Sequence, residues 1–192
     1  MRLAIGRASA AVLLVLGLGD AGGGTIAPSV VAAQSEIGFV CHQMGAPIAG
    51  SFRRFDAQVS FDAAEPQKGR FVISVDVSSV ELPTADATRE VVRPDWFDAL
   101  RFPRAVFEST AIRVGQRGRY EIAGRLTIKG HVQDVVVPVA LVQAGDLTIA
   151  SGELIVRRLQ FAIGEGEWND PSLVADDVQI RFRLALAGVG PI

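Results

Sequence analysis

The sequence is poor in the side chains that most often form cross-links or bind metals. Its 192 residues include one cysteine, Cys41, so the chain cannot form an internal disulfide and must be stabilised by its core. A lone cysteine most often behaves as a small buried hydrophobe. Histidine occurs only as His42 and His131, and neither belongs to a recognisable set of metal ligands. The sequence therefore predicts no metal site.

The chain also lacks a large excess of charge of either sign. The formal net charge is −2, lysine occurs only at Lys68 and Lys129, and the arginines are scattered along the chain. A protein that binds nucleic acid through phosphate contacts needs a clustered basic surface. The sequence therefore predicts no nucleic-acid partner, and it has no block of like charge that would form a polybasic anchor.

No catalytic arrangement or cofactor motif is recognisable. A nucleophilic mechanism needs a serine or cysteine beside a base, and the one candidate pair is the adjacent Cys41 and His42. The sequence predicts no catalytic residue and no cofactor. An enzyme that modifies a lipid or a small amphiphile with this pair is kept as an alternative.

The first 33 residues differ in kind from the rest. Residues 1–7 carry two arginines and no acid, residues 8–19 are apolar, and small residues follow up to Ala33. This order is typical of a secretory signal peptide, and the apolar run is too short to span a bilayer. We predict a signal peptide over residues 1–33, with cleavage after Ala33 (Ala21 is the weaker site), and one exported domain over residues 34–192.

Apolar and polar side chains alternate with period two after residue 35. The pattern is clearest in residues 71–77, 120–128, 135–141 and 178–186. Strict alternation indicates half-buried strands of an antiparallel sheet, and Lys129-Gly130 supplies a turn. We predict an all-β fold in which about eight strands close into a barrel with room for packed side chains or one small ligand. Pro138, inside an expected strand, predicts a bulge or an edge there.

Residues 84–102 break the alternation and predict helix. Thr84 or Asp86 can cap its start. Pro94 is expected to split the segment into two short helices, with the second beginning near Asp95. Apolar side chains of this insertion can cover one end of a barrel.

Short motifs recur along the chain in a definite order. They are SEIGF (35–39), GSF (50–52), DVSSV (76–80), RE (89–90), WFD (96–98), FP (102–103), FEST (107–110), GRLTIKG (124–130), R-x-x-x-F-x-I-G (157–164) and DVQI (177–180). Taken together, they resemble the YceI-like family, which are periplasmic proteins that bind polyisoprenoid lipids. The resemblance covers about residues 35–187. It implies an extended lipocalin-like antiparallel barrel, an apolar tunnel that holds a long isoprenoid chain, export, and often a homodimer.

A long isoprenoid chain needs only an apolar wall, since each buried CH₂ contributes about 0.8 kcal/mol. The candidate wall residues are Phe39, Phe52, Phe71, Ile73, Val75, Phe107, Tyr120, Ile122, Leu126, Phe161, Phe182 and Leu184. A solid core would use the same residues, because periodicity identifies the inward face without showing whether it is filled. Arg89, Arg93 and Arg157 are the candidates for a polar head group, since arginine binds phosphate well; a structural ion pair is the alternative for each.

Three functional hypotheses follow. The first is a non-catalytic carrier or binding protein for a polyisoprenoid or a related amphiphile such as a quinone. The second is the lipid-modifying enzyme described above. The third is an accessory protein of a membrane redox system. Transient contact with a membrane or a membrane protein is expected under the first and third.

Overall fold

A computed structural model describes residues 28–116 and 118–190. Its strands are β1 (Ser29–Val30), β2 (Glu36–Gln43), β3 (Ala46–Phe52), β4 (Phe55–Ser60), β5 (Arg70–Asp76), β6 (Val80–Glu81), β7 (Arg104–Val114), β8 (Arg119–Ile128), β9 (His131–Ala144), β10 (Leu147–Arg157) and β11 (Asp177–Ala187). One α-helix, α1 (Ala85–Val91), and five short 3₁₀ helices connect them: η1 (Ala32–Gln34), η2 (Pro66–Lys68), η3 (Val77–Ser79), η4 (Arg158–Phe161) and η5 (Gly166–Asn169).

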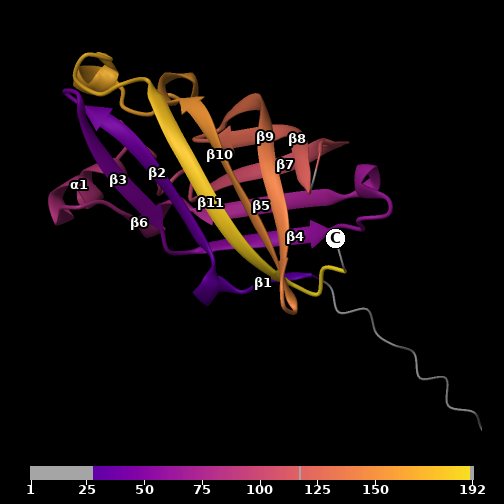
Figure 1. Ribbon diagram of the computed structural model, residues 1–192. Coiled ribbons are helices and arrows are strands. Elements are labelled where there is room, and N and C mark those ends of the chain that lie inside the picture. The colour runs from indigo at the N-terminus through magenta and orange to yellow at the C-terminus, as the bar shows by residue number, and fades with distance from the viewer. Residues whose placement is uncertain (1–27, 117, 191–192) are drawn as a thin grey trace, which may run out of the picture.

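The strands form one antiparallel sheet that curls over on itself (Figure 1). Its order is β4-β5-β7-β8-β9-β10-β11-β2-β3-β6, and β1 pairs with β11. The predicted all-β, lipocalin-like antiparallel fold is confirmed. Two details differ from the prediction. Within the described residues the sheet has eleven strands rather than about eight, and its hydrogen-bonded order ends at β4 and β6 rather than closing into a ring.

The β8–β9 hairpin shows how the sequence pattern produces this sheet. Lys129 and Gly130 both have positive φ, 49° and 78°, and they form a two-residue turn between the paired Ile128 and His131. Turns with two positive φ angles match the twist of antiparallel strands, and glycine adopts them readily. Because side chains alternate along each strand, one face of this hairpin is buried and the other is exposed.

The helical insertion is shorter than predicted. Thr84 caps α1 as expected, and its Oγ1 accepts a 3.2 Å hydrogen bond from the backbone N–H of Ala87. The second helix predicted near Asp95 is wrong, since turns follow Pro94. Asp98 has a left-handed φ of 48°, which a helix cannot continue through.

Pro138 marks a sheet edge, which is one of the two alternatives predicted for it. The ladder between β9 and β10 ends at the pair Val139–Gly152, while β10 continues its pairing with β11 as far as Arg157–Asp177. Pro138 therefore needs no partner on β10, which suits a residue without a backbone N–H.

The predicted signal peptide lies mostly outside the described residues. Its last part is described, and it contributes β1, whose Ser29 and Val30 pair with Ala187 and Leu186 of β11. The N–H of Val31 also donates to the carbonyl of Ala185 at 2.8 Å. Cleavage after Ala33 would remove these contacts; the cleavage site stays a prediction. No helix within the described residues is long and apolar enough to cross a membrane.

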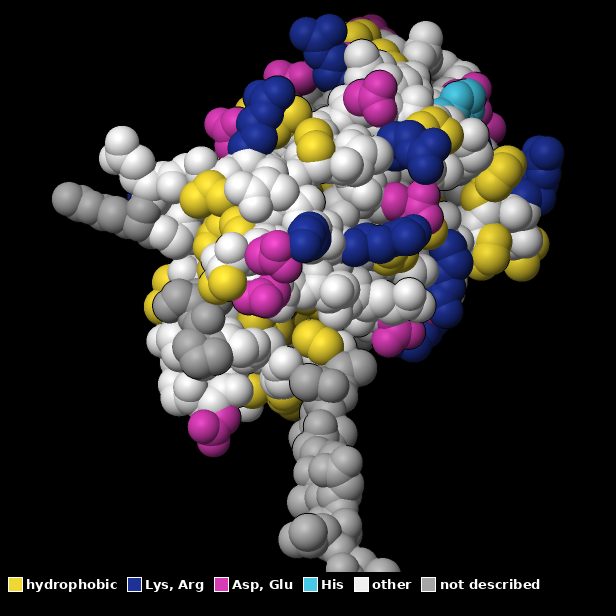
Figure 2. All heavy atoms as spheres, turned by 90° about the vertical axis from the view of Figure 1, so that its right-hand side faces the viewer, with side chains coloured by type: hydrophobic (Ala, Val, Ile, Leu, Met, Phe, Trp, Pro, Cys, Tyr) yellow, Lys and Arg dark blue, Asp and Glu magenta, His cyan; other side chains and the backbone are white. Residues whose placement is uncertain are grey.

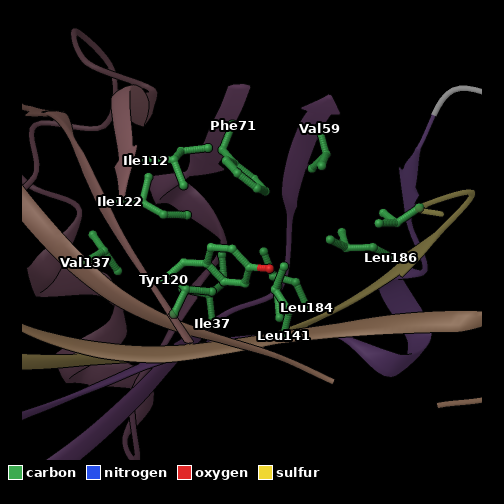
Figure 3. Close-up of a cluster of buried hydrophobic side chains, with 13 residues drawn as sticks. Ile37, Val59, Phe71, Ile112, Tyr120, Ile122, Val137, Leu141, Leu184 and Leu186 are labelled. Carbon is green, nitrogen blue, oxygen red and sulfur yellow. The ribbon is translucent and has the colours of Figure 1, made fainter. Parts of the chain in front are cut away.

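The inward faces of the strands form two apolar clusters. Figure 3 shows the larger one, in which side chains from opposite parts of the sheet, such as Phe71, Ile122 and Leu184, point toward one another. The smaller cluster contains Leu126 and Phe161 and lies nearer α1 and η4. The outer surface is different: the face in Figure 2 carries acidic and basic side chains interspersed with apolar ones.

Gly152 supplies a test of the close approach between β10 and β9. A Cβ at this position would lie 2.3 Å from the carbonyl oxygen of Pro138 and 2.7 Å from the Phe182 ring. Gly152→Ala is therefore expected to lower the free energy of unfolding by about 1–3 kcal/mol, measured by urea denaturation. The control is Gly190→Ala, because a Cβ there meets nothing within 4 Å. Equal stability of the two variants would contradict this packing.

Candidate functional site

The curled sheet encloses an apolar cavity of about 350 Å³. It runs through the interior between both apolar clusters and reaches α1 and the loop between η4 and β11. Eleven of the twelve predicted wall residues line it: Phe39, Phe52, Phe71, Ile73, Val75, Phe107, Ile122, Leu126, Phe161, Phe182 and Leu184. The interior is thus hollow, although periodicity alone was equally compatible with a solid core.

Tyr120 is the exception among the predicted wall residues. It is buried in the larger cluster and does not line the cavity. Its ring packs edge-on against Phe61 with the centroids 5.4 Å apart. Tyr120 points inward as its strand position predicts (Figure 3). It lies close to the end of the hairpin strand, however, where aromatic packing fills the space.

The two ends of the cavity differ in burial. At one end the wall includes Leu184 and Leu186, whose exposed fractions are 4% and 2%. At the other end the wall includes Glu90 of α1, whose side chain is 35% exposed. A side chain that lines the cavity and also meets solvent shows that the cavity approaches the surface beside α1. Leu186 is buried beside β1, where it pairs with Val30.

The lining residues with polar atoms gather at the α1 end, which we call the polar end. They are Cys41, Gln43, Glu90, Trp96, Arg158 and Trp168. Gln43 of β2 forms a bridge with Val174, and Arg158 donates to the carbonyls of both Val174 and Trp168. The Trp96 and Trp168 rings lie 5.6 Å apart. In Figure 1 this region is at the upper left, where η5 lies near the ends of β2 and β3.

Arg158 holds the loop that forms this end. Its side chain is buried, and all five of its donor hydrogens are directed to backbone carbonyls. Nε donates to Ala175 (3.1 Å), Nη1 to Ile163 (2.8 Å) and Gly164 (3.0 Å), and Nη2 to Trp168 (2.7 Å) and Val174 (2.6 Å). Desolvation lowers the pKa of Arg158, while nearby Asp176 opposes that shift. The guanidinium therefore replaces the backbone partners that this irregular loop lacks.

Sequence reasoning chose the neighbouring arginine instead. Arg157 is exposed and lies near Asp177, while Arg158 is 2% exposed. A usable signal was present, because Leu154 and Val156 face inward and the period of two assigns Arg158 to the same face.

The three arginines predicted to hold a head group lie on the outer surface. Arg89 pairs with Asp86, Arg93 with Glu90 and Arg157 with Asp177, and each arginine side chain is about two-thirds exposed or more. None of the three lines the cavity. Their positions match the alternative of structural ion pairs, which contribute little at a surface.

One polar group at this end has no partner. The indole Nε1 of Trp96 is buried, and no atom of the described residues accepts its hydrogen bond. Leaving a buried donor unsatisfied costs about 1–3 kcal/mol. Sequence reasoning did not identify Trp96 as a site residue, because the local sequence does not indicate whether a side-chain donor has a hydrogen-bond acceptor.

Cys41 and His42 do not form the catalytic pair that an enzyme would need. They are consecutive strand residues and point to opposite faces of the sheet. Cys41 lines the cavity, whereas His42 is exposed. Burial raises the pKa of the Cys41 thiol, so it is a poorer nucleophile than a free cysteine. Within the described ranges no three His, Cys, Asp or Glu side chains lie close enough to hold a metal ion.

Comparison with known proteins agrees with this geometry. Residues 29–186 match the family model of the YceI-like domain. The chain belongs to the YceI-like family. The crystal structure of BcnA from Burkholderia cenocepacia superposes with a TM-score of 0.79 and 41% identity, over 81% of this chain and 98% of that chain.

One more distant structure shares the fold. A polyisoprenoid-binding domain from Saccharophagus degradans has a TM-score of 0.66 at 14% identity, over 84% of this YceI-like chain and 98% of that chain. UPF0312 proteins from Azotobacter vinelandii and Vibrio cholerae are each 29% identical, over 50% and 59% of this chain. The matches span 50% and 60% of the length of those two relatives.

Arg158 can be tested directly for its role in holding the loop. Arg158→Met removes five hydrogen bonds and leaves their carbonyl acceptors without a partner, so we expect a loss of about 3 kcal/mol in the free energy of unfolding. Arg157→Met is the matched control and should stay within about 0.5 kcal/mol of the wild type. A similar, small effect of both substitutions in urea denaturation would argue against this role.

Proposed function

We propose that this protein is a non-catalytic binding and carrier protein for a polyisoprenoid or a similar long-chain amphiphile in the periplasm. The observation that carries the proposal is the cavity, whose wall is apolar along its length and whose few lining residues with polar atoms lie near α1. An amphiphile has the same division, with a tail that gains about 0.8 kcal/mol for each buried CH₂ and a head group that keeps polar partners.

Two further observations support the proposal. The Saccharophagus degradans neighbour is described as a polyisoprenoid-binding domain, and it shares this fold. In addition, Met44, Leu100 and Leu173 are exposed apolar side chains in the turns near the polar end. The N–H of Met44 donates to the carbonyl of Leu173, which joins two of these turns. Transient contact with a membrane or a membrane protein, through which lipid is exchanged, and formation of a homodimer belong to the same proposal.

The decisive experiment is native mass spectrometry of the protein purified from its own host, followed by organic extraction. We expect a bound species whose mass fits an isoprenoid chain with a head group. A protein that is empty and also takes up no added polyprenyl or quinone lipid would overturn the proposal.

Filling the cavity should abolish lipid binding while leaving the fold intact. Ala150 lines the cavity on β10, and Ala150→Phe would place a ring in the space of the lipid. Ile155→Phe is the matched control, because Ile155 lies on the same strand with its side chain exposed. Native mass spectrometry should find lipid on the control alone. Full lipid occupancy of Ala150→Phe would place the ligand outside this cavity.

The single cysteine provides an internal reporter of occupancy. Burial raises the pKa of Cys41, so less thiolate is present at a given pH, and maleimide labelling should accelerate only at a pH above that needed for a free thiol. Because Cys41 lines the cavity, bound lipid should slow its labelling further. Complete labelling in urea is the control for an intact thiol. An unchanged rate in lipid-loaded protein would contradict a ligand at this end.

A further inference from the structure

Three glycines occupy strand positions whose inward-facing neighbours line the cavity: Gly50 of β3, Gly124 of β8 and Gly152 of β10. At each of them a phenylalanine ring from the neighbouring strand takes the place of the missing side chain. An ideal Cβ would lie 2.4, 2.5 and 2.7 Å from ring atoms of Phe39, Phe107 and Phe182, respectively. All three rings line the cavity. The glycines therefore allow these rings to lie in the wall rather than across the interior.

Gly50 differs from the other two glycines in what a side chain would meet. At Gly124 and Gly152 a Cβ would also lie 2.5 and 2.3 Å from a backbone carbonyl oxygen, so a substitution there must move a strand. At Gly50 the three nearest atoms belong to side chains, among them Cζ of Phe39 at 2.4 Å and Cδ2 of Leu82 at 2.9 Å. Gly50→Ala can therefore be accommodated by side-chain movement, which leaves the sheet intact.

The cavity is the space into which the Phe39 ring would move. Phe39 and Gly50 are direct partners in the ladder between β2 and β3, so the backbone of β3 lies behind the ring. The Phe52 ring packs beside it with the centroids 5.6 Å apart, and Phe52 packs edge-on against Phe97 at 6.0 Å. With backbone behind it and a packed ring beside it, the Phe39 ring is displaced by a Cβ toward the empty interior.

This contact lies beside α1, where the cavity approaches the surface. The N–H of Leu82 donates to Oγ1 of Thr88 in α1 at 3.0 Å, which fixes Leu82 next to the helix. Leu82, Phe97 and the partly exposed Glu90 all line the cavity. A change in the position of the Phe39 ring therefore alters the width of the cavity at its α1 end.

We infer that Gly50 is a specificity-determining residue that sets the width of the cavity beside α1. By leaving its side-chain space to the Phe39 ring, it keeps the interior wide enough there for a chain with methyl branches. Such a chain is wider than a straight one, and an apolar pocket discriminates a single methylene by about tenfold or more. This inference rests on the proposed function, because it takes the lipid tail to lie in the cavity. It adds the residue that admits a branched tail.

The test compares geranylgeraniol with hexadecanol, two alcohols whose main chains have the same length and of which only geranylgeraniol carries methyl branches. Each is titrated into purified, delipidated protein. Gly50→Ala should weaken binding of geranylgeraniol at least about fivefold more than binding of hexadecanol. Ala49→Val is the matched control, because Ala49 is the preceding residue of β3 and is exposed on its other face. It should change the ratio of the two affinities less than about twofold.

Two substitutions of Phe39 separate the effect of the ring from that of the glycine. In the Phe39→Leu background the ring is absent, so adding Gly50→Ala should change the ratio of the two affinities less than about twofold. Phe39→Trp keeps the glycine but enlarges the ring system beyond the space that Gly50 leaves, so it should shift the ratio in the same direction as Gly50→Ala. Phe39→Trp also carries the test if Gly50→Ala alone does not fold, which urea denaturation reports.

An equal loss of both alcohols in Gly50→Ala, unchanged affinity for both, or a full effect of Gly50→Ala in the Phe39→Leu background would each overturn the inference. An unchanged ratio in Phe39→Trp would overturn it as well. Failure of both alcohols to bind to the wild type would instead overturn the proposed function, and the inference with it.

Discussion

The five hydrogen bonds of Arg158 are the interaction on which the polar end of the cavity depends. The segment between η4 and β11 has little regular structure, so its carbonyls lack the partners that a strand or helix would provide. One buried guanidinium satisfies five of them and joins Ile163 and Gly164 to Val174 and Ala175. The loop then packs against β2 and against the turn that carries Trp96. Because Arg158 satisfies the carbonyls of this loop, the loop does not need to place polar partners in the cavity beside it.

The same arrangement explains why the few lining residues with polar atoms lie at one end of the cavity. Along the strands, a polar side chain that points inward would be buried without a hydrogen-bond partner, which costs free energy. The wall is therefore made of apolar side chains. Where strands give way to turns, backbone and side-chain polar groups meet the cavity. Cys41 and Gln43 lie in the last part of β2, and Glu90 lies near the end of α1. The position of these few polar side chains thus follows from the architecture.

Period-two alternation identified the inward faces well. Tyr120, Ile122 and Leu126 point into the interior as expected, and the Lys129-Gly130 turn connects their strand to the next. Reasoning from sequence was weaker where long-range contacts decide the local conformation or the burial of a residue. Pro94 suggested a second helix, but the turn at Asp98 replaces it. Arg157 was preferred to Arg158 because a motif drew attention to it, although strand parity indicated the other residue.

The sequence by itself determined the strand pattern and the resemblance to the YceI-like family, and it limited the helix cap to Thr84 or Asp86 and Pro138 to a bulge or an edge, because each is encoded by neighbouring residues or by short motifs in order. Only the tertiary structure decided that the interior is hollow, that Arg158 is fully engaged and that the Trp96 donor has no acceptor among residues 28–116 and 118–190. Those properties depend on how far the sheet curls and on which distant atoms meet, and the period of a strand carries no information about either.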